Sequence, residues 1–164
     1  LNIYAIDIAT NTIADSITVG WMPESMVLDK NDVLWILNRG DESKSKSPGL
    51  TSVIDTDDVR VVTKNVLSGA PTNLVYNTGL NKLFFINTDI MSQGTDTELS
   101  MPSVWQAAGD KVFYSIEVNT TKGELYVSDI RDFVSKSVVY RYASDGTQLD
   151  EFSAGIIAGD FFFP

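Results

Sequence analysis

Residues 23–38, PESMVLDKNDVLWILN, decide the fold because the chain repeats their pattern twice. The second copy is PTNLVYNTGLNKLFFIN, residues 71–87, and the third is YSIEVNTTKGELYVSD, residues 114–129. Each copy predicts a short alternating strand, a polar turn and a second apolar strand that ends on Asn or Asp. The chain is therefore expected to consist of similar antiparallel units.

The spacing of the copies indicates the size of one unit. Met26, Leu74 and Ile116 occupy the same place in the three copies and are 48 and 42 residues apart. At this spacing each repeat is one small sheet. The second strands, LWIL and FFI, are apolar on both faces, which is typical of sheets packed face to face. We therefore expect an all-β fold, a β-propeller fragment of four-stranded antiparallel blades with about three and a half blades. The alternative is a β-sandwich, which gives no reason for the repeat.

The repeat also predicts where the units begin and end. We expect an outer hairpin of a blade at residues 1–20, blades at residues 21–68, 69–110 and 111–155, and a closing inner strand at residues 156–164. The outer strands of the blade at 69–110 look degenerate. Residues 88–103 have weak strand character and predict a long loop excursion, and residues 104–106 and 111–113 are expected to be the remains of the outer hairpin. The polar loop 39–49 is expected to bury no face.

Composition excludes several classes of function. The chain has 12 Lys and Arg against 22 Asp and Glu, a formal charge of −10, which opposes binding to nucleic acid and to anionic lipid. No apolar run approaches the roughly 20 residues of a spanning helix, so we expect no membrane-spanning segment. Without Cys or His the chain has no disulfide, no thiolate metal site and no imidazole base.

Three stretches carry a resemblance to a known family. LYVSD at residues 125–129, VYRY at 139–142 and IDIATNTI at 6–13 resemble the repeat of YVTN-type, surface-layer-like β-propellers of bacteria and archaea. GIIAGDF at residues 155–161 is similar to the C-terminal ends of propeller lipoproteins of unknown function. Asp129 stands where the motif has Asn, and Ala158 where Pro is usual.

The resemblance implies an extracytoplasmic location, in the periplasm or at the cell surface, with lipid anchoring through a missing N-terminus as one option. A ring needs more blades than this chain predicts, so we expect the C-terminal half of a propeller, with open sheet edges. The expected partner is the missing N-terminal half of the same propeller or a second copy of the chain.

Loops that follow second strands and loops that enter blades emerge on the same face of a propeller, which predicts a ligand-binding face. Its candidate residues are Trp21, Glu24, Asn38, Arg39, Asn73, Asn87, Asp129, Arg131 and Asp160. The oxygens of Asn38, Asn87 and Asp129 suit Ca²⁺ or sugar hydroxyls, although capping of strand ends is the favoured interpretation. Other carboxylate groups are expected in solvated turns: Asp41/Glu42, Asp55/Asp57/Asp58 and Asp129/Asp132. The Trp21 ring has two interpretations, stacking on a sugar or, preferred, packing beneath the adjacent loop.

Two functions remain open at this point. The first is a non-enzymatic extracytoplasmic binding or scaffold module without a cofactor, which engages a protein or glycan through its loop face. The alternative is a metal-dependent hydrolase of the lactonase type, in which Ca²⁺ polarises a substrate carbonyl. We prefer the first, because the enzyme would have to build its site from Glu24, Asn38, Asn87 and Asp129 with residues of a missing half.

Overall fold

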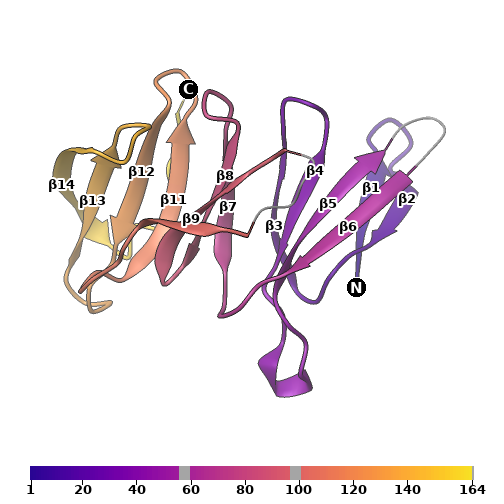
Figure 1. The fold of residues 1–164 in the computed structure, drawn as a ribbon, viewed down its shortest axis with the longest axis horizontal. Helices are drawn as coiled ribbons and strands as arrows, with labels where there is room; N and C mark the ends of the chain where they lie inside the picture. The colour runs from indigo at the N-terminus through magenta and orange to yellow at the C-terminus, as the bar shows by residue number, and fades with distance from the viewer. Residues whose placement is uncertain (56–59, 97–100, 164) are drawn as a thin grey trace.

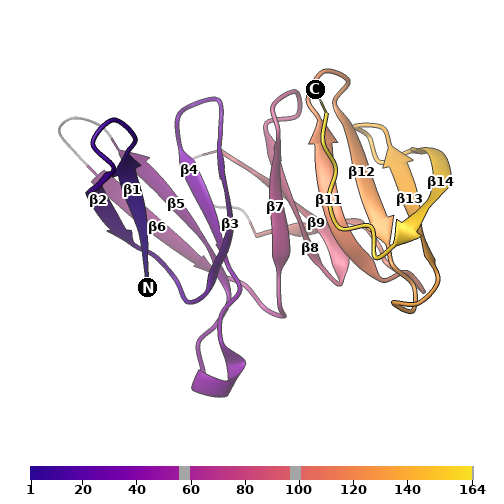
Figure 2. The same ribbon diagram turned by 180° about the vertical axis from the view of Figure 1, so that it is seen from behind.

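The computed structural model of the chain describes residues 1–55, 60–96 and 101–163. Within these ranges the fold is all-β apart from one short 3₁₀ turn, η1 (Glu42–Lys44). The strands form successive layers that lie side by side, with the N-terminal hairpin at one end and the last sheet at the other (Figures 1 and 2).

Three antiparallel sheets of four strands make up most of the molecule. The first contains β3 (Pro23–Leu28), β4 (Leu34–Asn38), β5 (Gly49–Asp55) and β6 (Arg60–Val66). The second contains β7 (Thr72–Asn77), β8 (Lys82–Asn87), β9 (Asp89–Gly94) and β10 (Ser103–Gln106). The third contains β11 (Phe113–Asn119), β12 (Glu124–Asp129), β13 (Lys136–Tyr142) and β14 (Gln148–Ile156). In each sheet the strands follow the chain order, so every connection is a hairpin, as the repeat predicts.

A two-stranded hairpin precedes the first sheet. It consists of β1 (Asn2–Asp7) and β2 (Thr12–Thr18), and the Asp7 carboxylate accepts backbone N–H bonds from Ala9 and Thr10 in its turn. Ile3 and Ile17 pack on Ile36 and Val53 of the first sheet. The hairpin therefore covers the outer part of that sheet, as an outer strand pair of a preceding blade would.

Apolar side chains fill the spaces between the layers because the second strand of a sheet is buried on both faces. In β8, Leu83 and Phe85 pack toward the first sheet, on Trp35 and Leu37 among others. Phe84, from the other face of β8, packs on the third sheet. Burying a Phe side chain stabilises the fold by roughly 1.5–3 kcal/mol. The predicted four-stranded antiparallel sheets are confirmed, and their succession of layers differs from a two-sheet sandwich.

The outer strands of the second sheet differ from the sequence expectation. The sequence predicted a loop excursion at residues 88–103, but β9 lies there, and every residue of β9 pairs with β8. Residues 111–113 are not part of the outer hairpin, because Phe113 begins β11. Ile90, Ser92 and Gln93 are buried, so polar residues occupy buried strand positions that a hydrophobic pattern does not reveal.

The last described residues, 157–163, form no strand, in contrast to the closing inner strand expected at 156–164. The segment runs along β11 (Figure 2). The ring centroids of Phe161 and Phe163 lie 6.3 and 4.8 Å from that of Tyr126. A strand needs a hydrogen-bonded neighbouring strand, and the described residues provide none for this segment. A hydrogen bond from the N–H of Ala158 to the Ser137 hydroxyl and the aromatic contacts hold it instead.

Candidate functional site

The loop between β4 and β5 projects from the first sheet (Figure 1). Asp41 and Lys46 exchange two backbone hydrogen bonds, of 2.8 and 2.9 Å, which close the base of the loop. Gly40 precedes this bridge with φ of +77°, and a Cβ there would lie 2.6 Å from the carbonyl oxygen of Lys46. Only glycine fits this position, so the sequence fixes the shape of the loop.

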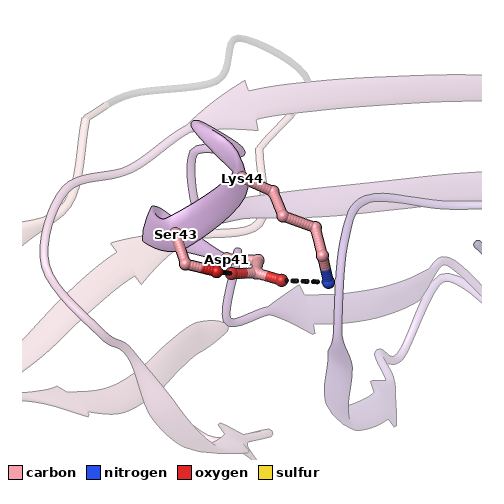
Figure 3. Close-up of polar contacts among 3 residues, drawn as sticks. All are labelled: Asp41, Ser43 and Lys44. Carbon is pink, nitrogen blue, oxygen red and sulfur yellow. Dashed lines mark hydrogen bonds and ion pairs between the residues drawn. The ribbon is translucent and has the colours of Figure 1, made fainter.

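The carboxylate of Asp41 organises the tip of the loop (Figure 3). One oxygen accepts a bond of 2.7 Å from the Lys44 ammonium, and the other accepts one of 2.6 Å from the Ser43 hydroxyl. These two bonds, that of Lys44 foremost, lower the pKa of Asp41 below its usual value. Lys44 is thus a paired cation.

Trp21 lies under this loop. The ammonium groups of Lys44 and Lys46 stand 5.4 and 5.5 Å from the centroid of its ring. Such cation–π contacts contribute about 0.5–1 kcal/mol each where they are exposed. The ring is half-buried beneath the lysines, which agrees with packing under the adjacent loop and leaves little of this face for stacking on a sugar.

A hollow of about 970 Å³ opens between this loop and the chain leaving β6. Its lining includes Met22, Leu67 and Pro48 as apolar residues, and Arg39 and Lys46 as cations. Both cations are exposed, and neither forms an ion pair within the described part of the chain. The hollow therefore presents positive charge on a protein whose formal charge is −10. We call it the Arg39 hollow.

Asn38, Asn87 and Asp129 end β4, β8 and β12, and each binds backbone close to its own sheet. Asn87 accepts a hydrogen bond from the N–H of Ala70 and donates one to the carbonyl of Ser68, in the segment that enters its sheet. Asp129 accepts from the N–H groups of Val112 and Arg131. These bonds agree with the capping interpretation.

Asn38 differs in detail from the other two. Its amide nitrogen lies within hydrogen-bond distance of the Thr51 hydroxyl and of the carbonyls of Ile36 and Gly49. Its oxygen is buried without a partner among the described residues. A Cβ on Gly20 would lie 2.7 Å from the Asn38 Cγ, so the entering segment approaches this amide closely.

Glu24 and Asn73 lie in contact across two sheets. A carboxylate oxygen of Glu24 accepts the backbone N–H of Asn73 at 3.0 Å, and Asn73 has a positive φ of 58°. Glu24 thus joins the starts of β3 and β7.

The last two candidates lie apart from the Arg39 hollow. Arg131 is exposed and follows the Asp129 cap with φ of 58°. Asp160 lies in the segment along β11, near Glu117. Burial is the main cause of the raised pKa of Glu117, and the negative charge of Asp160 raises it further. Of the nine candidates, only Arg39 lines the hollow, and Trp21 supports its loop.

Acidic side chains do not gather into a metal site in the ranges that the structure describes, where no group of three or more His, Cys, Asp or Glu could hold an ion. The Asn87 amide oxygen accepts one backbone N–H bond, and one carboxylate oxygen of Asp129, Oδ1, accepts two. Asp57 and Asp58 lie outside the described residues, as does the side chain of Asp55. The Ca²⁺ site stays a prediction.

Sequence reasoning missed the contribution of the loop at residues 39–49. Lys44 and Lys46 cover Trp21, and Asp41 and Gly40 shape the loop, so a segment expected to bury nothing builds a hollow. One feature of the sequence could have indicated this hollow. Three cations, Arg39, Lys44 and Lys46, lie within eight residues, although the chain as a whole is acidic.

The sheets and their hairpin order define the protein as a portion of a β-propeller. A search of solved structures supports this fold with a quinonprotein alcohol dehydrogenase-like protein from Bacteroides thetaiotaomicron, at a TM-score of 0.59 and 22% identity. The match covers 79% of this chain and 33% of that one, so this chain spans about a third of its length. No protein-family model and no curated protein matches the chain. No described helix is long and apolar enough to cross a membrane.

Proposed function

We propose that this propeller portion is a non-enzymatic binding module that engages a protein or glycan ligand through the Arg39 hollow. The observation that carries the proposal is the hollow itself, which has a volume of about 970 Å³ and is lined by Arg39 and Lys46, two cations that form no ion pair among the described residues. Ligand sites in proteins have volumes of this order and combine apolar walls with few polar groups.

The charges of the hollow favour an anionic ligand. Arg39 has a planar guanidinium that binds a carboxylate, sulfate or phosphate through two hydrogen bonds. Lys46 adds a second positive charge at the same hollow. Glu42 also lines it, which disfavours a continuous polyanion and favours a ligand with separate charged groups.

No specific observation supports the hydrolase alternative. An enzyme of that type needs a metal held by several oxygens, whereas the Oδ1 atoms of Asn87 and Asp129 accept backbone N–H groups as strand-end caps. The extracytoplasmic location is part of the proposal, and cell fractionation with an antibody to the chain tests it.

Binding to three immobilised probes tests the ligand class: a polysaccharide with widely spaced sulfate groups, a peptide with spaced acidic residues, and neutral dextran. We expect saturable binding to one of the two anionic probes, weakened by added salt, and none to dextran. Because a charge-assisted hydrogen bond contributes about 1.5–3 kcal/mol, Arg39→Ala with Lys46→Ala should weaken binding by about tenfold or more.

The matched control is Lys82→Ala with Lys136→Ala, which removes two exposed cations elsewhere and keeps the same net charge as the test variant. Equal weakening in both variants would show that net charge and not the hollow is responsible. Absence of binding to every probe would also refute the proposal.

A further inference from the structure

The first strand of the chain has one unpaired edge. β1 pairs with β2 and with no other described strand, whereas β5, β9 and β13, the third strands of the three sheets, each pair on both sides. The N–H of Val19 donates to the carbonyl of Leu1, which places Leu1, Ile3 and Ala5 in hydrogen-bonding pairs with β2. In an antiparallel ladder the residues between them, Asn2 and Tyr4, then direct their N–H and C=O groups to the free side.

The repeat shows what normally covers such an edge. Residues 2–5 of β1 correspond to residues 50–53 of β5, 48 positions later. Residues 50–53 of β5 are all buried, whereas three of residues 2–5 of β1 are exposed and Ile3 is half-buried. The difference arises because β5 lies beside β4, the second strand of its sheet, and no described strand has that position beside β1.

An uncovered apolar face lies on the first sheet beside the hairpin. Met26 and Leu28 on β3 are 58% and 57% exposed. Met26 pairs in register with Ile36, and Leu28 with Leu34, so both lie on the face that the β1–β2 hairpin covers farther out.

The repeat positions of Met26 are buried in the other two sheets. Leu74 is 4% exposed and Ile116 is 3% exposed. Leu74 packs on side chains of the preceding sheet, and Ile116 packs on Val75 and Phe84 of the second sheet. The exposure of Met26 therefore indicates that the first and second strands of a preceding sheet are the element that would cover it.

We propose that the edge of β1 and the Met26–Leu28 face together bind an inner β-hairpin supplied by a polypeptide segment other than residues 1–164. Its second strand adds antiparallel to β1, and its side chains cover Met26 and Leu28. This surface is separate from the Arg39 hollow and does not depend on the function proposed there.

The sequence of the three inner hairpins defines the chemistry of this partner. The second strands read LWILN, KLFFIN and ELYVSD, apolar on both faces and ending on Asn or Asp. In the sheets that residue binds backbone of the entering segment or of the third strand, as Asn87 and Asn38 do. The partner is thus an extended apolar hairpin that ends on Asn or Asp.

A second copy of the chain does not fit this surface. Its three inner hairpins are already paired with their own third strands, so none is free. The segment 157–163 offers one extended piece and no second strand. In the similar solved structure the matched portion is 33% of the chain, so there this fold occurs together with further polypeptide.

A peptide with the chain's own second inner hairpin, residues 71–87, serves as the probe. We expect fluorescence anisotropy to show saturable binding to the full chain, and hydrogen exchange to show protection of residues 1–8. Met26→Asp places a charge in the covered face, and Tyr4→Pro removes an edge N–H; each should weaken binding about tenfold or more.

The controls distinguish binding at this surface from non-specific hydrophobic binding of the peptide. Val134→Asp changes an apolar residue that is 73% exposed at the far end of the molecule and should leave binding unchanged. A peptide carrying Phe84→Ser and Ile86→Ser should bind about tenfold more weakly or not at all. No saturable binding, or equal weakening by Val134→Asp, would refute the proposal. A dimer of the chain alone with residues 1–8 protected would identify a second copy as the occupant and would also refute it.

Discussion

The hydroxyl of Ser25 on β3 accepts the backbone N–H of Leu74 on β7 at 2.9 Å, and so joins the first sheet to the second. The same hydroxyl donates to the Glu24 carboxylate at 2.5 Å, which in turn accepts the N–H of Asn73. Neighbouring sheets are therefore joined by polar contacts at the start of their inner strands as well as by apolar packing.

Ser25→Ala should destabilise the fold by about 1 kcal/mol, because the partly buried N–H of Leu74 loses its acceptor. The free energy of unfolding in urea measures this change. The control is Ser153→Ala at an exposed site on β14, where we expect a change within about 0.5 kcal/mol. Equal effects of both variants would mean that the bond does not join the sheets.

Asp29→Ala should destabilise the fold by about 2–3 kcal/mol, measured in the same way, because Asp29 is buried and accepts three hydrogen bonds. Two come from the N–H groups of Asn31 and Val33 and one, of 2.9 Å, from the indole of Trp35. Asp29→Asn keeps an oxygen acceptor and should have a smaller effect. If the two substitutions were equally damaging, the acceptor oxygen that asparagine keeps would contribute nothing to stability.

Gly69→Ala should destabilise more than Gly109→Ala. Both glycines have a positive φ, +76° and +60°, which disfavours alanine by about 1 kcal/mol. A Cβ at Gly69 would also collide with the amide oxygen of Asn87, whereas nothing lies within 4 Å of one at Gly109. Thermal unfolding compares the two variants, and equal midpoints would show that Asn87 moves aside easily.

The repeat predicted the strands and the caps because both follow from local pattern. Met26, Leu74 and Ile116 lie in inner strands, and Asn87 and Asp129 cap strand ends as the preferred interpretation had it. The Arg39 hollow could not be predicted, because it depends on where Lys44 and Lys46 stand over Trp21, a contact across 23 residues or more of sequence. β9 could not be predicted from the sequence because Ser92 and Gln93 are polar but buried. Their burial depends on tertiary packing and leaves no hydrophobic pattern in the sequence.

Glu117→Gln should stabilise the protein at neutral pH and lose this advantage in acid. Burial raises the pKa of Glu117, a hydrogen bond from the N–H of Val118 lowers it in part, and the nearby Asp160 carboxylate raises it again. The folded state thus holds the proton more tightly than the unfolded state, whose reference value is 4.5. The stabilising contribution of the protonated group is complete below that value and is lost as the pH rises through the folded pKa.

Glutamine cannot ionise, so the difference in melting temperature between Glu117→Gln and the parent protein should grow as the pH rises from about 4 to 7. Glu151→Gln on the exposed face of β14 is the matched control for the lost charge. Asp160→Asn removes the repulsion and should move the parent's profile toward that of the glutamine variant. A difference that grows toward acid instead would mean that ionised Glu117 stabilises the segment along β11, contrary to the sign derived from its burial.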